Sequence, residues 1–240
     1  LKRQAQRFGA DVRFGVVTNV DFDSRPFVVT VDGEKQIQAD SLIIATGASA
    51  KYLGLGSEMK YRGQGVSACA TCDGFFYRKQ DVAVVGGGNT AMDACRTAVR
   101  VGAENVYVIY RRTRAEMPAE DIEIEEAMEE GVQFLFLTNP DEYIGENGKI
   151  TQVKLQVMEL GEPDAGGRRS PVPVEGKFDY IEADSFIEAI GQKVSVSGFE
   201  GVELNRKGII CADEHSFRTN IEGVFAVGDA TNKGADIAIA

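Results

Sequence analysis

The sequence predicts an α/β fold in which a parallel sheet is built from alternating strands and helices. Two observations support this prediction. Apolar runs of strand length alternate with helical segments from Val82 to Leu137, and a glycine-rich turn, Gly86-Gly-Gly88, joins the first strand to the first helix. Strands that alternate with helices in this order lie parallel in one sheet. A chain of 240 residues can hold one large or two ordinary domains.

The composition disfavours several classes of protein. Hydrophobic residues make up 43% of the chain and charged residues 26%, as in soluble globular proteins, and no apolar run approaches the roughly 20 residues of a membrane span. The net charge of −11 disfavours nucleic acid and anionic lipid as partners, because both attract basic surfaces. Four cysteines, two of them in a C-x-x-C motif, fit a reducing compartment, so we expect a cytoplasmic protein. The single histidine, His215, lies in a polar segment, and we expect no metal site.

The first 65 residues are predicted to contain a helix, several strands and a linker. Helical spacing over residues 1–8 ends at Gly9, a residue type that often follows a helix. Residues 12–20 and 27–31 have strand patterns, and Asp32-Gly33 is a turn signal after the second of them. A third strand over residues 39–45 runs into Thr46-Gly47. Residues 51–65 are rich in glycine and polar groups, which predicts a linker.

The alternating region from Val82 consists of three strands and two helices. Gly102 and Gly131 are placed to end the helices, and Pro118 to open the second one. The predicted elements are strand 82–85, helix 89–101, strand 106–110, helix 119–130 and strand 132–137.

The last hundred residues interrupt this rhythm. Asn147-Gly148 predicts a hairpin, and residues 161–176, with three prolines, predict a loop. Residues 186–190 resume the sheet, and residues 191–201 are typical of a second linker. Two further strands are predicted at 208–211 and 224–227, the latter ending in Gly228-Asp229.

A two-thiol motif, Cys69-Ala-Thr-Cys72, is followed directly by Asp73. Two cysteines at this spacing near a helix start can close a small disulfide whose thiolate is stabilised by the helix dipole, and a neighbouring carboxylate can carry protons during thiol–disulfide exchange. The alternative is a pair of reduced core thiols. The sequence favours a redox role.

The glycine turn has the pattern G-x-G-x-x-A at Gly86, Gly88 and Ala91, directly after a hydrophobic strand. The first glycine allows the tight turn, the second lets the backbone approach a pyrophosphate, and the small third residue packs the helix on the strand. The helix that starts at Asn89 and Thr90 supplies free N–H groups to phosphates. A tight turn without a ligand is the alternative, but the required strand–helix–strand context is present.

The strand after this helix ends in an arginine cluster, Arg111, Arg112 and Arg114. An NAD site typically has an acidic residue here for the ribose hydroxyls, whereas arginines suit a 2′-phosphate. The glycine turn and the arginines together predict NADPH; the alternative is a solvated basic surface.

At this point the chain resembles a known family. Residues 1–81 are similar to bacterial thioredoxin reductases, in the segments Gly65-Val-Ser-Ala-Cys-Ala-Thr-Cys-Asp-Gly-Phe-Phe-Tyr-Arg78 and Leu42-Ile-Ile-Ala-Thr-Gly-Ala-Ser-Ala-Lys-Tyr-Leu-Gly-Leu55 and in Gln6-Arg-Phe-Gly9 with Arg25-Pro-Phe27. Residues 82–240 look closer to the glutamate synthase small-subunit type of NADPH flavoprotein, in Gly86–Arg100, Tyr110–Pro118, Met158–Asp164 and Glu188–Gln192.

The resemblance implies two Rossmann-like dinucleotide-binding domains. Residues 1–61 and 192–240 would form a discontinuous, incomplete FAD domain, and residues 62–191 an inserted NADPH domain carrying the redox centre. The family's N-terminal G-x-G-x-x-G for FAD is not found, and Asn232-Lys-Gly-Ala-Asp236 lacks the pattern that the reductases place over the flavin. We therefore expect an N-terminally truncated chain.

The resemblance also assigns roles. Electrons would pass from NADPH through FAD to a Cys69–Cys72 disulfide and on to a protein disulfide such as thioredoxin. Cys72 would face the flavin, Cys69 would attack the substrate and Asp73 would be the acid–base group, while Arg111 and Arg112, with Arg114 less clearly, would bind the 2′-phosphate. Thr46, Gly47, Gly228 and Asp229 would lie at the FAD, and the full-length protein would be a homodimer. The alternatives are an electron-entry flavoprotein resembling the glutamate synthase small subunit and an inactive NADPH-binding fragment.

Overall fold

The computed structural model describes residues 1–164, 166–167 and 169–231, and its chain divides into two compact units. Of the described residues, the first unit contains Leu1–Ser49 and residues 192–231, and the second contains Ala50–Gly191. The two connecting segments pair with each other as short strands, β5 (Ser49–Ala50) and β14 (Gln192–Lys193). The α/β class predicted from the sequence is confirmed.

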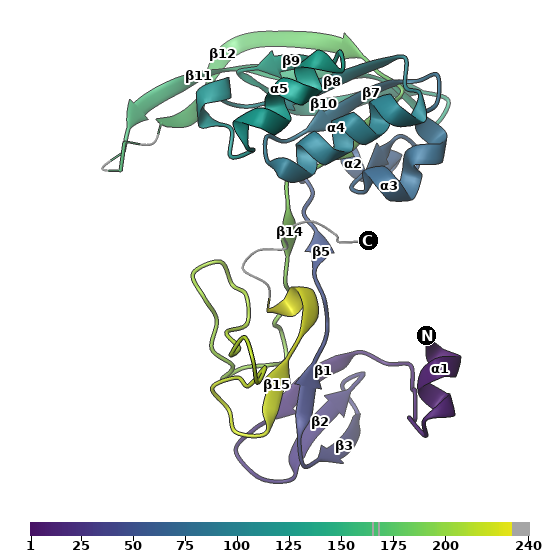
Figure 1. The fold of residues 1–240 in the computed structure, drawn as a ribbon, viewed down its shortest axis with the longest axis vertical. Helices are drawn as coiled ribbons and strands as arrows, with labels where there is room; N and C mark the ends of the chain where they lie inside the picture. The colour runs from purple at the N-terminus through teal and green to yellow at the C-terminus, as the bar shows by residue number, and fades with distance from the viewer. Residues whose placement is uncertain (165, 168, 232–240) are drawn as a thin grey trace. The chain divides into compact units, whose positions relative to one another are not determined.

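The second unit is built on a five-stranded parallel sheet of order β6-β13-β7-β8-β9. Strands β7, β8 and β9 of this sheet are labelled in Figure 1. A three-stranded antiparallel sheet, β10-β11-β12, packs against it. The elements of this unit are α2 (Glu58–Tyr61), β6 (Val66–Ser67), α3 (Ala70–Asp73), η1 (Gly74–Tyr77), β7 (Asp81–Val85), α4 (Asn89–Val101), β8 (Asn105–Tyr110), η2 (Arg114–Glu116), α5 (Asp121–Glu129), β9 (Gln133–Phe136), β10 (Thr138–Glu146), β11 (Lys149–Pro163), β12 (Arg169–Glu182) and β13 (Ser185–Glu188).

Alternate residues of the buried strand β7 divide the core of this unit into two layers. Val82 and Val84 face helices α4 and α5, whereas Ala83 and Val85 face the antiparallel sheet. All four are at most 4% exposed. A strand that is buried on both faces has a continuous apolar sequence, as seen here.

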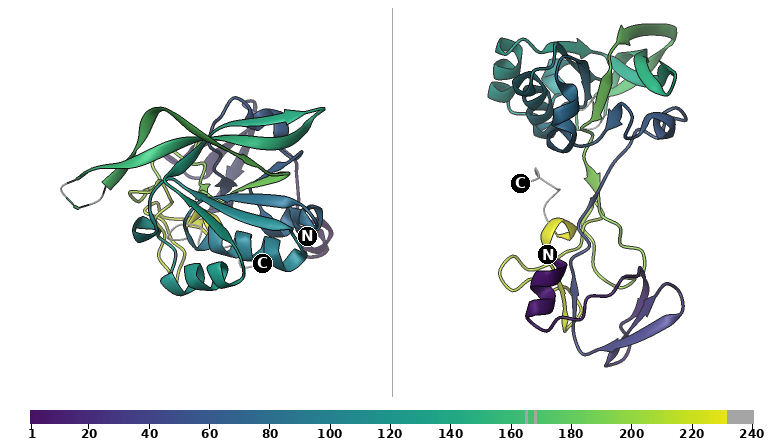
Figure 2. Two further views of the ribbon diagram at one scale, coloured as in Figure 1. Left: turned by 90° about the horizontal axis from the view of Figure 1, so that it is seen from above. Right: turned by 90° about the vertical axis from the view of Figure 1, so that its right-hand side faces the viewer.

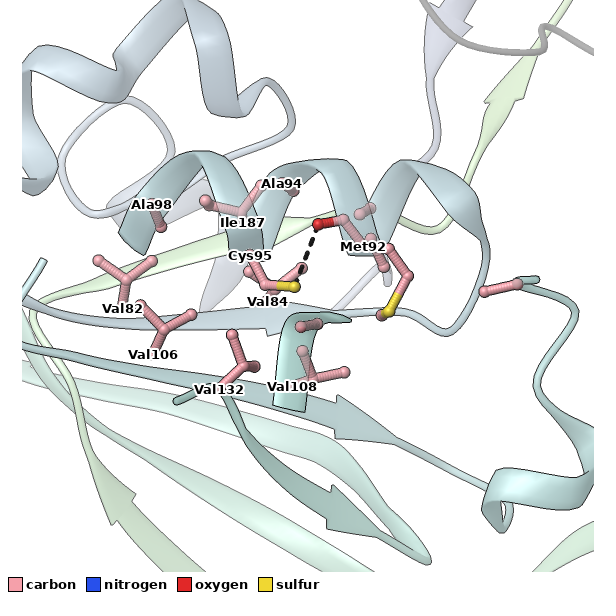
Figure 3. Close-up of a cluster of buried hydrophobic side chains, with 14 of the residues drawn as sticks. Val82, Val84, Met92, Ala94, Cys95, Ala98, Val106, Val108, Val132 and Ile187 are labelled. Carbon is pink, nitrogen blue, oxygen red and sulfur yellow. Dashed lines mark hydrogen bonds between the residues drawn. The ribbon is translucent and has the colours of Figure 1, made fainter. Parts of the chain in front are cut away.

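Cys95 belongs to the helix-side layer and has a structural role. Its thiol lies beneath α4 among Val84, Val108 and Val132 and donates to the carbonyl oxygen of Met92 at 3.2 Å (Figure 3). Burial raises the pKa of this thiol to about 12, so it stays protonated and unreactive in the folded chain.

The first unit is smaller and contains two separate sheets. Strands β1, β2 and β3 form an antiparallel meander, and β4 pairs in parallel with β15. Phe27, Ile44, Ile210 and Val224 are at most 2% exposed in its core. The elements of this unit are α1 (Lys2–Arg7), β1 (Val17–Asp21), β2 (Phe27–Val31), β3 (Lys35–Ala39), β4 (Leu42–Ile44), β15 (Val224–Ala226) and η3 (Gly228–Ala230).

Several predicted strands in the first unit differ from the structure. The strand predicted over 12–20 begins only at Val17, after Gly15 adopts a φ of 151°. The strand predicted over 39–45 is divided between β3 and β4, because the chain turns at Asp40 and Ser41. Residues 208–211 form no strand and contribute one isolated bridge, Leu204 to Ile210.

The prediction of a loop over residues 161–176 is wrong. Strands β11 and β12 continue through most of it as a long antiparallel hairpin, which projects from its sheet in the left view of Figure 2. Pro171 and Pro173 are tolerated because β12 is an edge strand, bonded to β11 alone.

The first boundary between units also differs from the predicted position after residue 61. It lies between Ser49 and Ala50. Residues 51–65 have a linker-like composition, but Tyr61 is 1% exposed and packs with Phe186 and Val153 beneath the antiparallel sheet, together with Leu53 and Leu55. The second boundary falls between Gly191 and Gln192.

Candidate active site and nucleotide pocket

Cys69 and Cys72 form a disulfide in the second unit, with an S–S distance of 2.00 Å. Cys69 is the N-cap residue of the single-turn helix α3, and its sulfur accepts the amide N–H of Cys72 at 3.2 Å. The Ser67 hydroxyl, at the end of β6, accepts the amide of Cys69 at 3.0 Å and fixes the entry to the turn. Cys72 is exposed and Cys69 half-buried, so the bond is open to a partner from outside.

Asp73 follows the disulfide at the end of α3 and lines a cavity of about 520 Å³ together with Ser67, Phe76 and Tyr77. Burial raises the pKa of Tyr77 to about 12, and its hydroxyl donates to the Cys69 carbonyl oxygen at 3.5 Å. Tyr77 therefore stays neutral at physiological pH and acts as a hydrogen-bonding support of the redox turn. Asp73 is the carboxylate adjacent to the disulfide in sequence, and its role as a proton carrier stays a prediction.

The glycine turn lies between β7 and α4, and each of its glycines has a different reason for being there. A Cβ at Gly86, where φ is 144°, would lie 2.4 Å from the carbonyl oxygen of Ala189, and a Cβ at Gly87 would lie 2.4 Å from the Tyr110 ring. Gly88, the N-cap of α4, has an ordinary φ of −97°, and its Cβ would meet only Pro118 at 3.8 Å. The protein's own packing thus requires the first two glycines but not the third.

The start of α4 leaves backbone donors for a ligand. The amides of Ala91 and Met92 both donate to the carbonyl oxygen of Gly88. The amides of Asn89 and Thr90 come before the first amides that donate within the helix, so helix geometry gives them no intrahelical acceptor. A glycine without a packing role beside two free amides fits a site where a phosphate approaches the backbone.

A pocket of about 550 Å³ opens at this turn. It lies at the carboxyl ends of the parallel strands, the edge at which open α/β sheets bind ligands. Its wall contains Gly86, Gly88 and Thr90 from the turn, Arg111 and Arg112 after β8, Ala189 to Gly191 after β13, and Lys51.

The pocket is strongly basic in a chain of net charge −11. Lys51, Arg111 and Arg112 line it, and no carboxylate does. Among the described residues, none forms an ion pair with these three side chains. Arg112 is 8% exposed, and its buried Nε has no hydrogen-bond partner in the described chain. An unpaired guanidinium at this burial is costly unless an anion is bound.

Three residues proposed for this site from the sequence do not line the pocket. Ala91 is fully buried in the helix-side core, where a small residue packs α4 on the strand. Arg114 forms a 3.0 Å ion pair with Glu125 of α5 and does not line the pocket. Asn89 also falls outside the lining, and its side-chain oxygen accepts the Glu120 amide at 3.1 Å, which holds the loop before α5. The sequence pattern gave no indication of Lys51 or Tyr110 in the lining. Lys51 lies in the segment 42–55 that resembles the reductase family, but the linker-like composition of residues 51–65 does not indicate a nucleotide contact.

The predicted flavin-side motifs both lie in the first unit. Thr46-Gly47 follows β4 and Gly228-Asp229 follows β15, and these strands pair in parallel. The Val227 amide donates to the Ile44 carbonyl oxygen at 3.0 Å, so the two motifs meet at one sheet edge. Gly47 and Gly228 have positive φ of 65° and 68°, and a Cβ added at either position would have no heavy atom within 4 Å. The segment Asn232–Asp236, also considered in the sequence, lies outside the described residues.

Two further features bear on the class of protein. Within residues 1–164, 166–167 and 169–231, no helix is long and apolar enough to cross a membrane. In the same part of the chain, no three His, Cys, Asp or Glu side chains cluster as metal ligands would.

An exposed disulfide and a basic dinucleotide-type pocket in one α/β unit define a nucleotide-dependent disulfide oxidoreductase. The chain matches the family described as pyridine nucleotide-disulphide oxidoreductase over residues 3–240, and it belongs to that family.

Similar proteins include several reductases and two enzymes with other names. The chain is 38% identical to thioredoxin reductase of Vibrio cholerae over 237 residues, which cover 95% of this chain and 69% of that protein. It is 38% identical to glucosaminate ammonia-lyase of Pseudomonas fluorescens over 239 residues, which cover 97% and 69%. It is 41% identical to the NADP(+)-dependent formate dehydrogenase subunit beta of Moorella thermoacetica over 214 residues, which cover 84% of this chain and 29% of that subunit.

Among solved structures, thioredoxin reductase of Lactococcus lactis in its FR conformation superposes with a TM-score of 0.74 at 28% identity. The match covers 95% of this chain and 69% of that one. The resemblance to thioredoxin reductases predicted from the sequence is confirmed. The closer likeness of residues 82–240 to the glutamate synthase small-subunit type stays a prediction.

Proposed function

We propose that this chain belongs to an NADPH-dependent flavoprotein that reduces a disulfide on another protein through Cys69 and Cys72. The observation that carries the proposal is that one unit contains both a closed, accessible disulfide and a basic pocket at a glycine turn. The family to which the chain belongs is described as pyridine nucleotide-disulphide oxidoreductase, and such a reaction needs both a nucleotide site and a disulfide.

NADPH fits the pocket on charge and shape. Its pyrophosphate would lie at Gly88 and the amides of Asn89 and Thr90, where a side chain is absent without a packing reason. Its 2′-phosphate would lie at Arg111 and Arg112, whose guanidinium groups suit bidentate phosphate contacts. Arg114 has a partner in Glu125 and is left out of this assignment.

The first unit offers fewer assigned contacts to FAD than the pocket of the second unit offers to NADPH. Thr46-Gly47 and Gly228-Asp229 meet at one sheet edge and would contact the flavin nucleotide there. When bound, FAD accepts hydride from NADPH and supplies two electrons to the disulfide. All other steps of the proposal use the side chains of this chain.

The reduced cysteines would act by thiol–disulfide exchange. The Cys69 thiolate attacks a substrate disulfide and forms a mixed disulfide, releasing one substrate thiolate that takes up a proton. The Cys72 thiolate then attacks Cys69, re-forms the Cys69–Cys72 bond and releases the second substrate thiolate. Asp73 would carry the protons, since it follows Cys72 and lines the adjoining cavity. Two electrons and two protons pass from the chain to the substrate in each cycle.

A protein substrate fits the surface around the disulfide. Phe75 and Phe76, directly after the redox turn, are 90% and 65% exposed and pack edge-to-face against each other. Exposed aromatic side chains beside a reactive group favour docking of a protein surface. Thioredoxin, named in several relatives, is the substrate we propose, with a homodimer and a cytoplasmic location as parts of the same proposal.

A second candidate is an electron-entry flavoprotein without a dithiol step. The identity of 41% to a formate dehydrogenase beta subunit favours it. The closed disulfide disfavours it, because a route that ends at another electron acceptor needs no exposed cystine.

One experiment separates these candidates. NADPH is added anaerobically to the purified chain while its visible spectrum and its free thiols are recorded. The proposal expects a flavin band that bleaches as two thiols appear, and a Cys72→Ser variant that bleaches without new thiols. Bleaching without thiols in the wild-type chain would favour the electron-entry candidate. A colourless chain that gains no thiols would mean that these 240 residues are a nucleotide-binding fragment.

A further inference from the structure

The basic residues of the nucleotide pocket lie on both sides of its glycine turn. The strand order places β7, which leads into the turn, between β8 and β13. Arg111 and Arg112 follow β8, whereas Lys51 is held beside the end of β13, where its amide donates to the Gly191 carbonyl oxygen at 2.9 Å. The pocket therefore has two arginines on one side of the turn and one lysine on the other.

This arrangement restricts which phosphate Lys51 can meet. In a dinucleotide bound across such a turn, the pyrophosphate lies at the turn and the adenosine half extends over the neighbouring strand, here β8. The 2′-phosphate belongs to the adenosine half and therefore lies on the side of Arg111 and Arg112. A cation on the β13 side is separated from it by the turn, and the nearest anionic group is the pyrophosphate, which NADP(H) and NAD(H) share.

We propose that Lys51 is a pyrophosphate-binding residue of the nucleotide pocket and that bound nucleotide thereby holds the paired connections between the two units. The inference rests on the proposed function, because it needs a dinucleotide in this pocket. Lys51 lines the pocket, has no ion-pair partner among the described residues, and stands next to Ala50, where the second unit begins.

The connections offer a physical route for this effect. The Lys51 amide bonds to Gly191 in the return connection, and the Leu53 amide donates to the Glu188 carboxylate at 3.2 Å. A pyrophosphate held between the Lys51 ammonium and the glycine turn adds a third tie, which joins the Lys51 segment to the start of α4. Nucleotide binding should then slow opening of the Lys51–Gly191 hydrogen bond, which amide exchange measures.

The test compares NADP⁺ and NAD⁺ binding by calorimetry in the 240-residue chain, its Lys51→Gln variant and a matched Lys177→Gln control. Lys177 is an exposed lysine of β12 in the same unit and lies outside the pocket lining. We expect Lys51→Gln to weaken both nucleotides about tenfold, Lys51→Arg to restore most of the affinity, and Lys177→Gln to change neither. Amide exchange at Lys51 should slow on adding NADP⁺ in the wild-type chain and much less in Lys51→Gln.

The contrary outcomes are distinct. Weakening of NADP⁺ alone would overturn the assignment, because Lys51 would then contact the 2′-phosphate. Unchanged affinities in Lys51→Gln, with the wild-type chain binding both nucleotides, would overturn the inference and leave the proposed function intact. A wild-type chain that binds neither nucleotide would overturn the proposed NADPH site itself.

Discussion

Glu188→Gln should remove a specific part of the pH dependence of stability. Glu188 ends β13, is 2% exposed, and accepts the Tyr143 hydroxyl at 2.6 Å and the Leu53 amide at 3.2 Å. Burial is the main reason that its pKa rises from 4.5 to about 7, and the nearby charge of Glu58 adds to the effect. A glutamine can keep both contacts, since its oxygen can accept from Leu53 and its amide can donate to the Tyr143 oxygen.

The size and sign of the effect follow from proton linkage. Because the pKa of Glu188 is higher in the folded chain than in the unfolded chain, the folded state binds this proton more tightly. Its stabilising contribution is complete below pH 4.5 and is lost as the pH rises through about 7. At about 1.4 kcal/mol for each pH unit between the two pKa values, the loss between pH 5 and pH 8 is about 2.5 kcal/mol.

Urea unfolding, followed by circular dichroism at several pH values between 5 and 8, measures this loss. The free energy of unfolding of the wild-type chain should fall relative to that of Glu188→Gln by about 2.5 kcal/mol over the range. Glu58→Gln is the control: the fall should persist there with its midpoint at lower pH, because only a neighbouring charge has been removed. Parallel stability curves for the wild-type chain and Glu188→Gln would refute the reasoning.

The remaining predictions concern the nucleotide pocket. Replacing Arg111 and Arg112 together by glutamine should weaken NADP⁺ about 100-fold and NAD⁺ little, as measured by calorimetry, because only NADP⁺ has the 2′-phosphate; equal losses would mean that the arginines do not read it. Gly88→Ala should cost less than about 1 kcal/mol of stability yet weaken both nucleotides at least about tenfold, since its Cβ has room in the protein but fills the phosphate approach. Gly86→Ala should instead lower stability by about 2 kcal/mol or more in thermal unfolding, because its Cβ would meet the Ala189 carbonyl oxygen at 2.4 Å.

Local sequence signals located most of the parallel sheet and its helices. Strand β7 and helix α4 are apparent because both faces of the strand are buried and Gly102 ends the helix with a φ of 94°. The hairpin β11–β12 was not apparent, because its prolines and glycines are turn signals and only an edge position accommodates them. The residue pattern within a strand does not show whether that strand will lie at the edge of its sheet.

The candidate site was predictable where a motif carries it. The disulfide and the glycine turn have fixed spacings, so Cys69, Cys72 and Gly86 could be assigned from sequence. Lys51 could not, because its place in the pocket depends on a hydrogen bond to Gly191, far along the chain. A contact between two segments that are far apart in the sequence produces no periodic pattern in either segment.

The division of the chain sets an order for folding during synthesis. Among the described residues, the second unit is one continuous segment, Ala50–Gly191, and this part of the unit has been made once Gly191 leaves the ribosome. The first unit is different, because β4 (Leu42–Ile44) waits for its parallel neighbour β15 (Val224–Ala226). A long loop must close before that pairing forms, which makes it an intrinsically slow contact. The redox turn and the nucleotide pocket can therefore be complete while the first unit is still an unpaired strand and a meander, with Ile44, which is 1% exposed in the folded chain, open to the chaperones that bind nascent chains.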